Sequence, residues 1–543
     1  MPTYPSRTQV VIVGAGPTGL TVANLLAAYR VNFVVLDREP GPMNLPRAIV
    51  LDDEGARTLQ VFGLDKSFVA HTIKAVGSKY LDDAGGCIAE TGAGPETYGF
   101  AKRQYIYQPE LERALRERLD EQAPGCLFFA SNVTHVLEAS GEAIVNVTDG
   151  SGRQHQISAD WVLACDGGRS PIRESLRIGM SGNTYMQDWI VLDMIEDPDP
   201  SRFSKFYCSS IRPTVSVPAP NGGRRYEFML LPGEKREDVL ADSFLADLLK
   251  PFRDYDGAKV LRKTVYTFHA RIADRFRSGR ILLLGDAAHL TPPFAGQGMN
   301  AGLRDAHNVA WKIAVAVKGG AEAATLDSYE LERRKPAWDM ILVAVTMGNF
   351  VMPADAEQLR FRELLLAALG PYPNVRDYLI QMKFKPRPRY AEGLFLDLDV
   401  PVFEASLVGE MIPQPRVPTG EGTVLLDEKL GPGFALITQS PAARTAATGI
   451  GHELLGLPMA HVHLDNGDPF SDTANWMRID PSARPLLTHR DQVMLVRPDR
   501  YCAASFDPAE LVSGLNRYRS LFSRVNLASS SPIERAVAFS ASP

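Results

Sequence analysis

The N-terminal segment has a pattern that constrains the fold more than any other stretch of the chain. A short apolar, β-branched run at residues 9–13 leads into Gly14-x-Gly16-x-x-Gly19, and residues 20–29 then have the character of a helix. Such a run is typical of a buried parallel strand. Glycines at the following turn let the backbone approach a pyrophosphate group, whose charge lies at the N-terminus of the helix. The segment therefore predicts the first unit of a parallel α/β sheet.

An acidic residue follows the second strand of this unit. Residues 32–36 form another apolar run that ends at Asp37, 18 residues after Gly19. An acid in this place can accept hydrogen bonds from a ribose, and Arg38 beside it is a further candidate contact. The unit predicts dinucleotide binding, without separating FAD from NAD, against a glycine turn of purely structural use. A secretory signal is a poor alternative, because glycines and Pro17 interrupt the apolar run.

A second strand that ends in an acid lies far downstream, within residues 279–304. The apolar run at 281–284 meets Gly285-Asp286, a loop rich in proline and glycine follows, and a helix is expected from Gly298. The acid can accept hydrogen bonds from a ribose or ribityl hydroxyl group. The unpaired N–H groups of the helix N-terminus can stabilise negative charge beside it. This arrangement suits a flavin, because the reduced flavin carries negative charge on its N1/O2 edge.

A third segment, residues 161–173, again runs from an apolar strand into an acid and a glycine. Asp166 and Gly167 follow the strand, and Ser170 and Arg173 lie at the start of the next helix. On its own this pattern is typical of an ordinary turn, in which the acid caps the helix and Arg173 is a surface charge. It gains weight only in combination with the other two segments.

Together the three segments resemble the class A flavoprotein monooxygenases, which are FAD-dependent aromatic hydroxylases. That family carries GxGxxG, DGxxSxxR and a motif of the form GDAAHxxPPxxGQGxN, and all three occur here in the same order over roughly the first 400 residues. The one departure is Asp37, where the family more often has glutamate, and either acid can bind a ribose. Residues 212–218 and 224–234 look most similar to the 3-(3-hydroxyphenyl)propionate hydroxylases and their phenol-hydroxylase-like relatives.

The resemblance implies an α/β protein of three parts. These are a discontinuous Rossmann-like FAD-binding domain of the GR2 type with a mixed sheet, an inserted β-sheet substrate domain and a C-terminal thioredoxin-like domain. The expected boundaries are 1–75, 105–180 and 276–400 for the first, 76–104 and 181–275 for the second, and 401–543 for the third. The last part has no CxxC, so a packing or dimer role is expected there instead of a redox role.

The resemblance also implies an activity. NADH or NADPH would reduce FAD, the reduced flavin would react with dioxygen, and the resulting C4a-hydroperoxide would hydroxylate a phenol or phenolic acid ortho or para to its hydroxyl group. The cofactor supplies this chemistry, while the protein positions the ring, promotes phenolate character and excludes water. The sequence gives neither the phenol, the ring position, nor the choice between NADH and NADPH.

The positions that match the motifs are the candidate cofactor contacts. They are Gly14, Gly16, Gly19, Asp37, Arg38, Arg47, Gln108, Asp166, Gly285, Asp286, Gly298, Met299 and Asn300. The resemblance places Arg47 beside the cofactor, against the alternative of a surface arginine after a turn. It also makes Gln108 an FAD contact, against the alternative of a polar helix cap.

Three residues are candidates for a role in catalysis. Pro293 is one, because in related hydroxylases the main chain at this Pro-Pro step faces the substrate. His269 is a candidate base for a phenol, although a structural histidine with no part in catalysis is at least as good an interpretation. Arg47 is the third candidate. His289 has more the character of a hydrogen-bonded structural residue. The helical spacing that begins at Met299 indicates a core face, which comprises Met299, Leu303, Ala306, Ala310 and Ile313.

Composition limits the other classes of function. The net charge of −6 gives no bulk attraction for nucleic acid or an anionic membrane, and no apolar run reaches the ~18 residues of a spanning helix. The five cysteines are scattered without CxxC, which indicates reduced thiols in a cytoplasm and no metal site. The expected partner is a small aromatic molecule. The sequence does not decide whether the protein forms a homodimer.

Rival members of the same fold fit less well. Halogenases carry WxWxIP, and here no two tryptophans are two positions apart. An NAD-dependent dehydrogenase would explain GxGxxG but not residues 279–304. Two alternatives stay open: an FAD-binding protein without hydroxylase activity, and an epoxidase or reductase that acts on a non-phenolic substrate.

Overall fold

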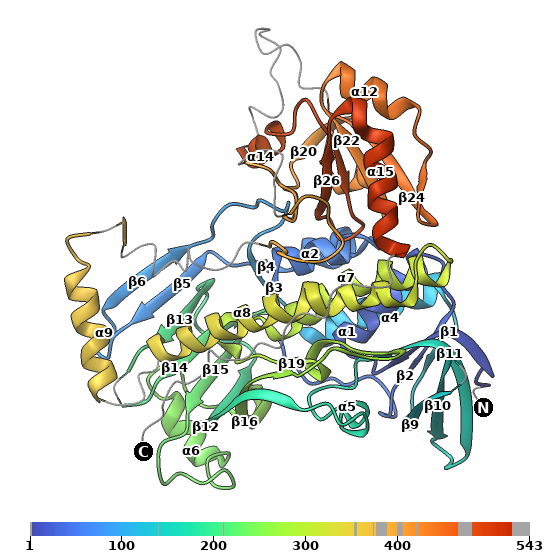
Figure 1. The fold of residues 1–543 in the computed structure, drawn as a ribbon. Coiled ribbons are helices and arrows are strands. Elements are labelled where there is room, and N and C mark those ends of the chain that lie inside the picture. Colours follow the sequence, from blue (N-terminus) through green and yellow to red (C-terminus); the bar gives the residue numbers. More distant parts are fainter. Residues whose placement is uncertain are drawn as a thin grey trace.

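The computed structural model describes residues 3–139, 141–209, 211–351, 356–372, 374–375, 388–398, 405–419, 422–464 and 481–523. The expected C-terminal domain, residues 401–543, is therefore described only in part. Within the described residues the chain forms two eight-stranded sheets, one five-stranded sheet and two smaller ones, with helices packed against them (Figure 1). This is the mixed α/β fold expected from the sequence.

The first sheet brings the acid-bearing strands together. They are β1 (Arg7–Val13), β2 (Phe33–Leu36), β11 (Gln154–Ala164) and β18 (Ile281–Leu283). The strand β1 pairs in parallel with β2 and with β11, and β11 pairs in parallel with β18. Because parallel strands end at the same edge of a sheet, the turns after Val13, Leu36, Ala164 and Leu283 meet there.

Other strands extend this sheet and make it mixed. They are β8 (Leu127–Phe128), β9 (Ser131–Ala139), β10 (Glu142–Asp149) and β17 (Arg277–Ser278). The pairs β9–β10 and β10–β11 are antiparallel, as is β17–β18. A smaller antiparallel sheet stands beside it, built from β3 (Val50–Asp52), β4 (Ile73–Lys74) and β7 (Arg103–Tyr105).

Helices cover the first sheet. They are α1 (Pro17–Ala28), α2 (Asp53–Gln60), α4 (Gln108–Gln122) and α7 (Gly298–Val317). Helix α1 packs against both α4 and α7. In α7, Leu303, Ala306, Ala310 and Ile313 are fully buried, as their spacing predicted, whereas Met299 is half-buried.

The second sheet joins two distant segments of the chain. Its strands are β5 (Gly77–Leu81), β6 (Cys87–Gly92), β12 (Met180–Met194), β13 (Phe203–Tyr207), β14 (Thr214–Ala219), β15 (Gly223–Met229), β16 (Val260–Ala273) and β19 (His289–Leu290). They lie in the order β19-β16-β12-β15-β14-β13-β5-β6. Domain boundaries themselves stay a prediction.

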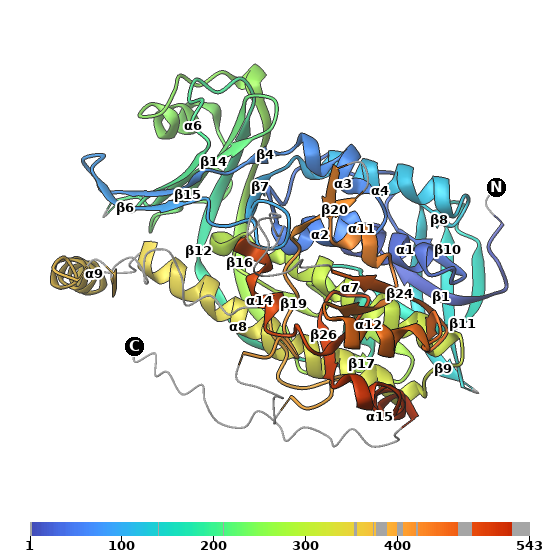
Figure 2. The same cartoon turned by 90° about the horizontal axis from the view of Figure 1, so that it is seen from above.

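The two faces of the second sheet have different neighbours. Trp189 and Phe268 lie on one face, in a cluster with Phe294 and with Ala344 of α8 (Asp327–Val351). Residues that alternate with them lie on the other face and pack near α6 (Asp242–Leu249). Figure 1 shows α8 and α6 on opposite sides of this sheet. Figure 2 shows α8 reaching past the sheet, with α9 (Ala356–Ala368) at its far end.

The C-terminal unit stands over α2 and α7 (Figure 1). Its sheet contains β22 (Phe434–Thr438), β23 (Glu453–Leu454), β24 (Leu457–His463), β25 (Val493–Val496) and β26 (Cys502–Phe506), with α12 (Pro441–Thr448) and α15 (Leu511–Ser520) beside it. The thioredoxin-like classification of this unit stays a prediction. Every helix in the described part of the chain is too short or too polar to cross a membrane.

Candidate functional site

The three glycines of the first turn are constrained in different ways. A Cβ atom at Gly14, whose φ is +105°, would lie 2.3 Å from the carbonyl oxygen of Cys165, and one at Gly19 would lie 1.9 Å from the carbonyl oxygen of Gly14. A Cβ atom at Gly16 would meet no protein atom within 4 Å. Packing of the turn therefore requires glycine at the first and third positions, whereas the space in front of Gly16 is open to a ligand.

The start of α1 adds an anion site to this open space. The helix begins at Pro17, and no side chain caps its first turn. Its unpaired N–H groups and the positive end of its dipole can therefore bind an anion beside Gly16. The geometry fits the pyrophosphate group of a dinucleotide.

Asp37 is tied to the glycine turn. Its Oδ2 accepts a hydrogen bond from the N–H of Ala15 at 2.6 Å, and its Oδ1 accepts one from Glu39 at 2.8 Å. Each oxygen keeps a lone pair for a ribose hydroxyl group. Arg38 is exposed, and its Nε lies 3.5 Å from Oε1 of Glu39. The structure therefore brings Asp37 to the glycine turn and leaves Arg38 at the surface.

The loop after β11 contains an unsatisfied acceptor. Oδ2 of Asp166 accepts a hydrogen bond from Ile172 at 3.2 Å, while its buried Oδ1 has no partner among the described residues. Burial raises the pKa of Asp166, and the nearby hydroxyl group of Ser170 opposes the rise. A buried acceptor without a partner is costly, and a hydroxyl group of a bound cofactor would satisfy it. Arg173 is 6% exposed, so it is not the surface charge of an ordinary turn.

The loop after β18 is packed tightly against the first turn. A Cβ atom at Gly285 would lie 2.6 Å from Oγ1 of Thr18, and one at Gly302 would lie 2.2 Å from the same atom. Small residues at these two positions therefore allow α1 and α7 to approach each other. As a result the open end of α7 lies close to the glycine turn.

Asp305 of α7 holds this loop in place through contacts with Gly285 and His289. Its Oδ2 accepts a hydrogen bond from the N–H of Gly285 at 3.0 Å and lies 2.7 Å from Nε2 of His289. Its Oδ1 accepts one from Arg333 at 2.8 Å. Burial opposes ionisation, but His289 and Arg333 together lower the pKa of Asp305. His289 is 1% exposed and has the structural role expected from the sequence.

Asp286 lies close to Arg47 and Tyr266. Its side chain is exposed, yet enough protein surrounds it for burial to raise its pKa, and His289 and Arg47 reduce that rise. Tyr266 is 47% exposed, and its pKa is raised by burial and then by Asp286. An acid, a cation and a phenol ring therefore lie near one another here.

The backbone at Arg47 is held from two sides. Oε1 of Gln108 accepts hydrogen bonds from the N–H groups of Arg47, at 3.2 Å, and Ala48, at 2.6 Å. From the second sheet, Arg225 donates to the carbonyl oxygen of Arg47 at 2.7 Å and to that of Pro46 at 3.1 Å. The exposed guanidinium of Arg47 is thus carried on a fixed backbone. No pattern in the sequence indicates this role of Gln108 and Arg225, and a direct contact between Gln108 and FAD stays a prediction.

The N-terminus of α7 is open. No side chain caps it, and a Cβ atom at Gly298 would meet nothing within 4 Å. The side chain of Asn300 is occupied by the chain itself, because its Oδ1 accepts from Asp52 at 3.0 Å and its Nδ2 donates to Val50 at 3.1 Å and Gly296 at 2.8 Å. A cofactor contact here would therefore use main-chain N–H groups.

Pro293 leads into an aromatic contact with the second sheet. The ring of Phe294 lies 5.9 Å from that of Trp189 and 5.3 Å from that of Phe268, measured between centroids. His269 lies on the other face of the strand, where its Nδ1 is 3.1 Å from Oγ1 of Thr184. The structure therefore brings Pro293 to the same side of the sheet as the Arg47 backbone but does not bring His269 there.

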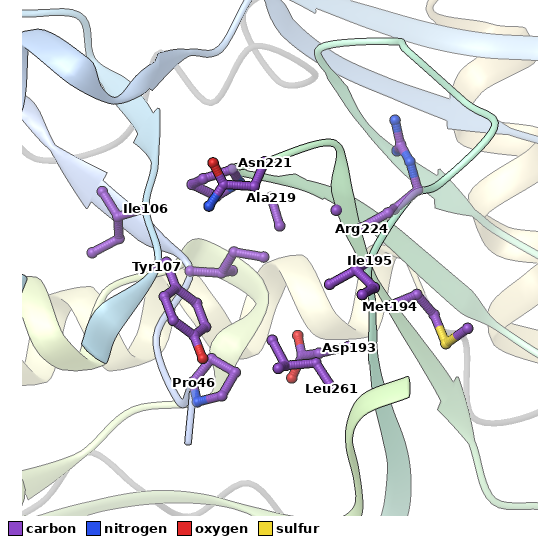
Figure 3. Close-up of a pocket in the computed structure, with 13 residues that line it drawn as sticks. Pro46, Ile106, Tyr107, Asp193, Met194, Ile195, Ala219, Asn221, Arg224 and Leu261 are labelled. Carbon is purple, nitrogen blue, oxygen red and sulfur yellow. The ribbon is translucent and has the colours of Figure 1, made fainter. Parts of the chain in front are cut away.

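A pocket of about 190 Å³ adjoins the Arg47 backbone. Its lining, which is mostly apolar, includes Pro46, Ile106, Tyr107, Asp193, Arg224 and Leu261. Figure 3 shows Pro46 and Tyr107 on one side of it and the end of the second sheet on the other. Tyr226, a tyrosine of β15, does not line this pocket. It is buried and donates a hydrogen bond to Asp197 at 3.0 Å.

One acidic group is neutralised by the chain. Asp52, Asp53 and Glu54 present carboxylate oxygens within 4.8 Å of one another. Arg304 donates to both oxygens of Glu54, at 2.8 and 3.0 Å, and also to Asp52. The group therefore joins α2 to α7 as a buried ion pair.

The geometry of the site fits FAD. The open Gly16, the uncapped ends of α1 and α7 and the unsatisfied Oδ1 of Asp166 all belong to loops that meet at one edge of the first sheet. Asp286 adds an acid near the end of α7. These groups could hold a pyrophosphate, hydroxyl groups and the negative edge of a flavin ring.

Comparison with known proteins agrees with this geometry. Residues 7–344 match the family described as FAD binding domain, and residues 409–521 match the HcaD C-terminal domain. The chain is 35% identical over 531 residues to a 3-(3-hydroxy-phenyl)propionate/3-hydroxycinnamic acid hydroxylase of Klebsiella pneumoniae subsp. pneumoniae, covering 94% of each chain. It is 35% identical to one of Burkholderia cenocepacia, covering 96% of this chain and 97% of the other.

A solved structure shows the same fold. In a ternary complex of aklavinone-11 hydroxylase with FAD and aklavinone, the enzyme superimposes with a TM-score of 0.76 at 22% identity. The match covers 96% of this chain and 100% of that chain. At this identity the likeness concerns the fold alone.

Proposed function

The chain belongs to the FAD-dependent aromatic hydroxylases, and we propose that it hydroxylates a phenol or phenolic acid at a ring position ortho or para to the hydroxyl group. NADH or NADPH and dioxygen are the co-substrates. The observation that carries this proposal is the shared identity of 35% with relatives named for 3-(3-hydroxy-phenyl)propionate and 3-hydroxycinnamic acid, over 94% of both chains. The grouping of Asp286, Arg47 and Tyr266 supports it.

FAD is the cofactor, and the following residues would hold it. The N-terminus of α1, beside Gly16, would bind the pyrophosphate, and Asp37 would bind the adenosine ribose. Asp286 would accept hydrogen bonds from the ribityl chain. Reduced FAD supplies the activation of dioxygen. The N-terminus of α7, at Gly298 and Met299, would stabilise negative charge on the flavin ring.

The chain itself would position and shield the aromatic substrate. The face of the second sheet that carries Trp189 and Phe268 packs on Phe294, so the main chain at Pro293 is fixed beside an apolar wall. A ring held against such a wall is oriented and kept from water. Arg47, on its fixed backbone, would supply positive charge near Asp286.

Further properties follow as expectations. The three-domain division, a cytoplasmic location and a homodimer belong to this proposal. Analytical ultracentrifugation would test the last of these.

Oxidation of NAD(P)H by the FAD-loaded protein tests the function. The rate is measured with and without a panel of phenols and phenolic acids, and products are identified by mass spectrometry. We expect strong stimulation and a product heavier by one oxygen atom. Stimulation with hydrogen peroxide as the only product would mean that the ring is bound but misplaced. No stimulation by any phenol would favour a non-phenolic substrate or an FAD-binding protein without hydroxylase activity.

A further inference from the structure

Three rows of side chains cross the central strands of the second sheet on its Phe294 face. The registers place Met229 and Tyr266 beside Trp189, Glu227 and Thr264 beside Val191, and Arg225 and Arg262 beside Asp193. Successive rows are two residues apart along each strand, so all three share one face at a spacing of ~6.7 Å. Glu227 is the acid of the middle row.

The outer rows are fixed to two different loops. The Trp189 row meets Phe294, which follows Pro293. The Asp193 row meets the other loop, because Arg225 and Arg262 donate to the carbonyl oxygen of Pro46. The middle row therefore lies between the contact with the Pro293 turn and the contact with the Arg47 backbone. Both loops carry candidate catalytic residues, so a ring bound between them would lie over the middle row.

Glu227 is buried without a close partner. Its residue is 8% exposed, and it accepts no hydrogen bond from any residue that the structure describes. The nearest cation is Arg225, whose Nη1 lies 4.0 Å from Oε1, beyond hydrogen-bond distance. Burial raises the pKa of Glu227; Arg225 opposes the rise and Asp193 adds to it. A largely buried carboxylate without a hydrogen-bond donor is stabilised by a ligand that supplies one.

Arg225 does not form a hydrogen bond with Glu227, because its nitrogens already donate to other groups. Its Nε donates to Oδ1 of Asp193 at 2.7 Å, and its two terminal nitrogens donate to the carbonyl oxygens of Arg47 and Pro46 at 2.7 and 3.1 Å. Its second bond to Asp193 is 3.1 Å long. Glu227, in the middle row, is therefore the carboxylate of this face that lacks such a partner among the described residues.

We propose that the carboxylate of Glu227 binds the phenolic hydroxyl group of the substrate and accepts its proton. The proposal rests on the proposed function, because it requires a phenol as substrate. The O–H bond of the phenol breaks, an O–H bond forms on Glu227, and the electron pair stays on the ring oxygen. No electrons are exchanged, and the same carboxyl group returns the proton when the product leaves.

This role also orients the substrate. A phenolic acid has one donor group and one anionic group, and Glu227 attracts the first and repels the second. The hydroxyl group therefore turns toward β15, and the acidic side chain turns away from it. The positive charges of Arg225 and Arg262 stay in place and stabilise the phenolate that forms.

The first test compares Glu227→Gln with the unaltered FAD-loaded enzyme on fluorinated phenols of falling pKa. Glutamine keeps the size and polarity of the side chain but cannot accept a proton. We expect product formation from the least acidic phenol to fall ~100-fold or more. The loss should shrink as the phenol becomes more acidic and as the pH rises. No loss, or an equal loss on every phenol, would overturn the proton transfer.

Asp188→Asn is the matched control. Asp188 lies on β12 but on the opposite face, where it accepts from Thr267 at 2.6 Å and pairs with Arg236 at 3.0 Å. Its variant removes the same charge from the same sheet and should keep the dependence on phenol pKa of the unaltered enzyme. FAD content and the thermal midpoint of both variants establish that they fold.

The second test measures binding without turnover. Dissociation constants of phenol and of its methyl ether, anisole, are determined by calorimetry with oxidised enzyme and no NAD(P)H. The unaltered protein should bind phenol at least tenfold more tightly, and Glu227→Ala should bind the two alike. A preference that survives in Glu227→Ala would refute the contact. If the preference depends on Glu227 but no phenol is hydroxylated, the contact stands and the proposed function fails.

Discussion

The guanidinium group of Arg173 donates to the carbonyl oxygen of Ala287 at 3.1 Å and so joins loops that are 114 positions apart in the chain. The same nitrogen donates to Gly168 at 3.2 Å. One loop presents Asp166 and the other Asp286. This buried side chain therefore adds a link, beyond the pairing of β11 with β18, that fixes the relative position of these two candidate cofactor contacts.

Arg173→Met should weaken FAD binding. Methionine fills much of the same volume but makes neither hydrogen bond, so the loops lose their link. We expect the dissociation constant of FAD to rise about tenfold, equivalent to ~1.4 kcal/mol, as measured by equilibrium dialysis with the apoprotein. Arg177→Met, at an exposed position in the next turn, is the control. Equal affinities in the two variants would contradict the role of Arg173.

Gly16→Ala should lower the affinity for FAD, whereas Gly19→Ala should lower the stability of the fold. A Cβ atom at Gly16 meets no protein atom, and its φ of −76° suits alanine, so the apoprotein should keep its stability while FAD affinity falls. A Cβ atom at Gly19 would lie 1.9 Å from the carbonyl oxygen of Gly14, which should destabilise the fold by ~3 kcal/mol. Chemical denaturation of both apoproteins and FAD titration separate the effects. Tight FAD binding by Gly16→Ala would show that the open space is not the pyrophosphate site.

Asp286→Ala should strongly reduce FAD retention, because the carboxylate that would accept hydrogen bonds from the ribityl chain is lost. Asp286→Asn should retain more flavin, since the amide oxygen can still accept a hydrogen bond. The flavin-to-protein absorbance ratio after purification gives the occupancy. Full occupancy in the alanine variant would remove Asp286 from the set of cofactor contacts.

Arg47→Ala should slow flavin reduction by NAD(P)H more than it affects folding. The side chain is exposed, and its backbone is held by Gln108 and Arg225 whatever the side chain is. Stopped-flow absorbance follows the reduction, and thermal unfolding checks the fold. Arg113→Ala removes an exposed arginine of α4 that pairs with Glu117, away from the site, and this variant should be reduced at the normal rate. An unaltered rate in Arg47→Ala would remove this assignment.

The local elements of the site could be predicted because their signals are contiguous in the sequence. The runs at 9–13 and 281–284 are strands, and each ends in the turn that the glycines indicated. Helix α1 starts at Pro17 instead of Leu20, since proline suits the first turn of a helix. Because parallel strands end at the same edge of a sheet, the turns that follow them could also be expected to meet there.

The cross-links of the site could not be predicted, because they depend on tertiary contacts. Nothing near Gln108 in the sequence indicates that it binds the backbone at Arg47. Alternation along β16 shows that His269 and Phe268 point to opposite faces, but only the contact of Phe268 with Phe294 shows which face lies toward the site. Glu227 was missed for the same reason.

The C-terminal unit is joined to α8 by a buried ion cluster at Glu332. Arg497, at the end of β25, donates to its two oxygens at 2.9 and 2.7 Å, and Lys312 of α7 donates at 2.8 Å. Burial opposes ionisation, but the two cations outweigh it and lower the pKa of Glu332 from 4.5 to about 2. A carboxyl group whose pKa is lower in the folded state stabilises the fold above its unfolded pKa. That stability is lost as the pH falls from about 4.5 toward 2.

Glu332→Gln should therefore lower stability and flatten its dependence on acid pH. At pH 7 the variant leaves Lys312 and Arg497 without this counter-charge, which should cost ~3–5 kcal/mol. Because glutamine does not titrate, the difference from the unaltered protein should shrink as the pH falls below about 4.5. Urea unfolding at a series of pH values measures both effects, and Glu322→Gln, at an exposed position, should change neither. A difference that stays constant from pH 7 to pH 3 would mean that Glu332 acts through packing and not through its charge.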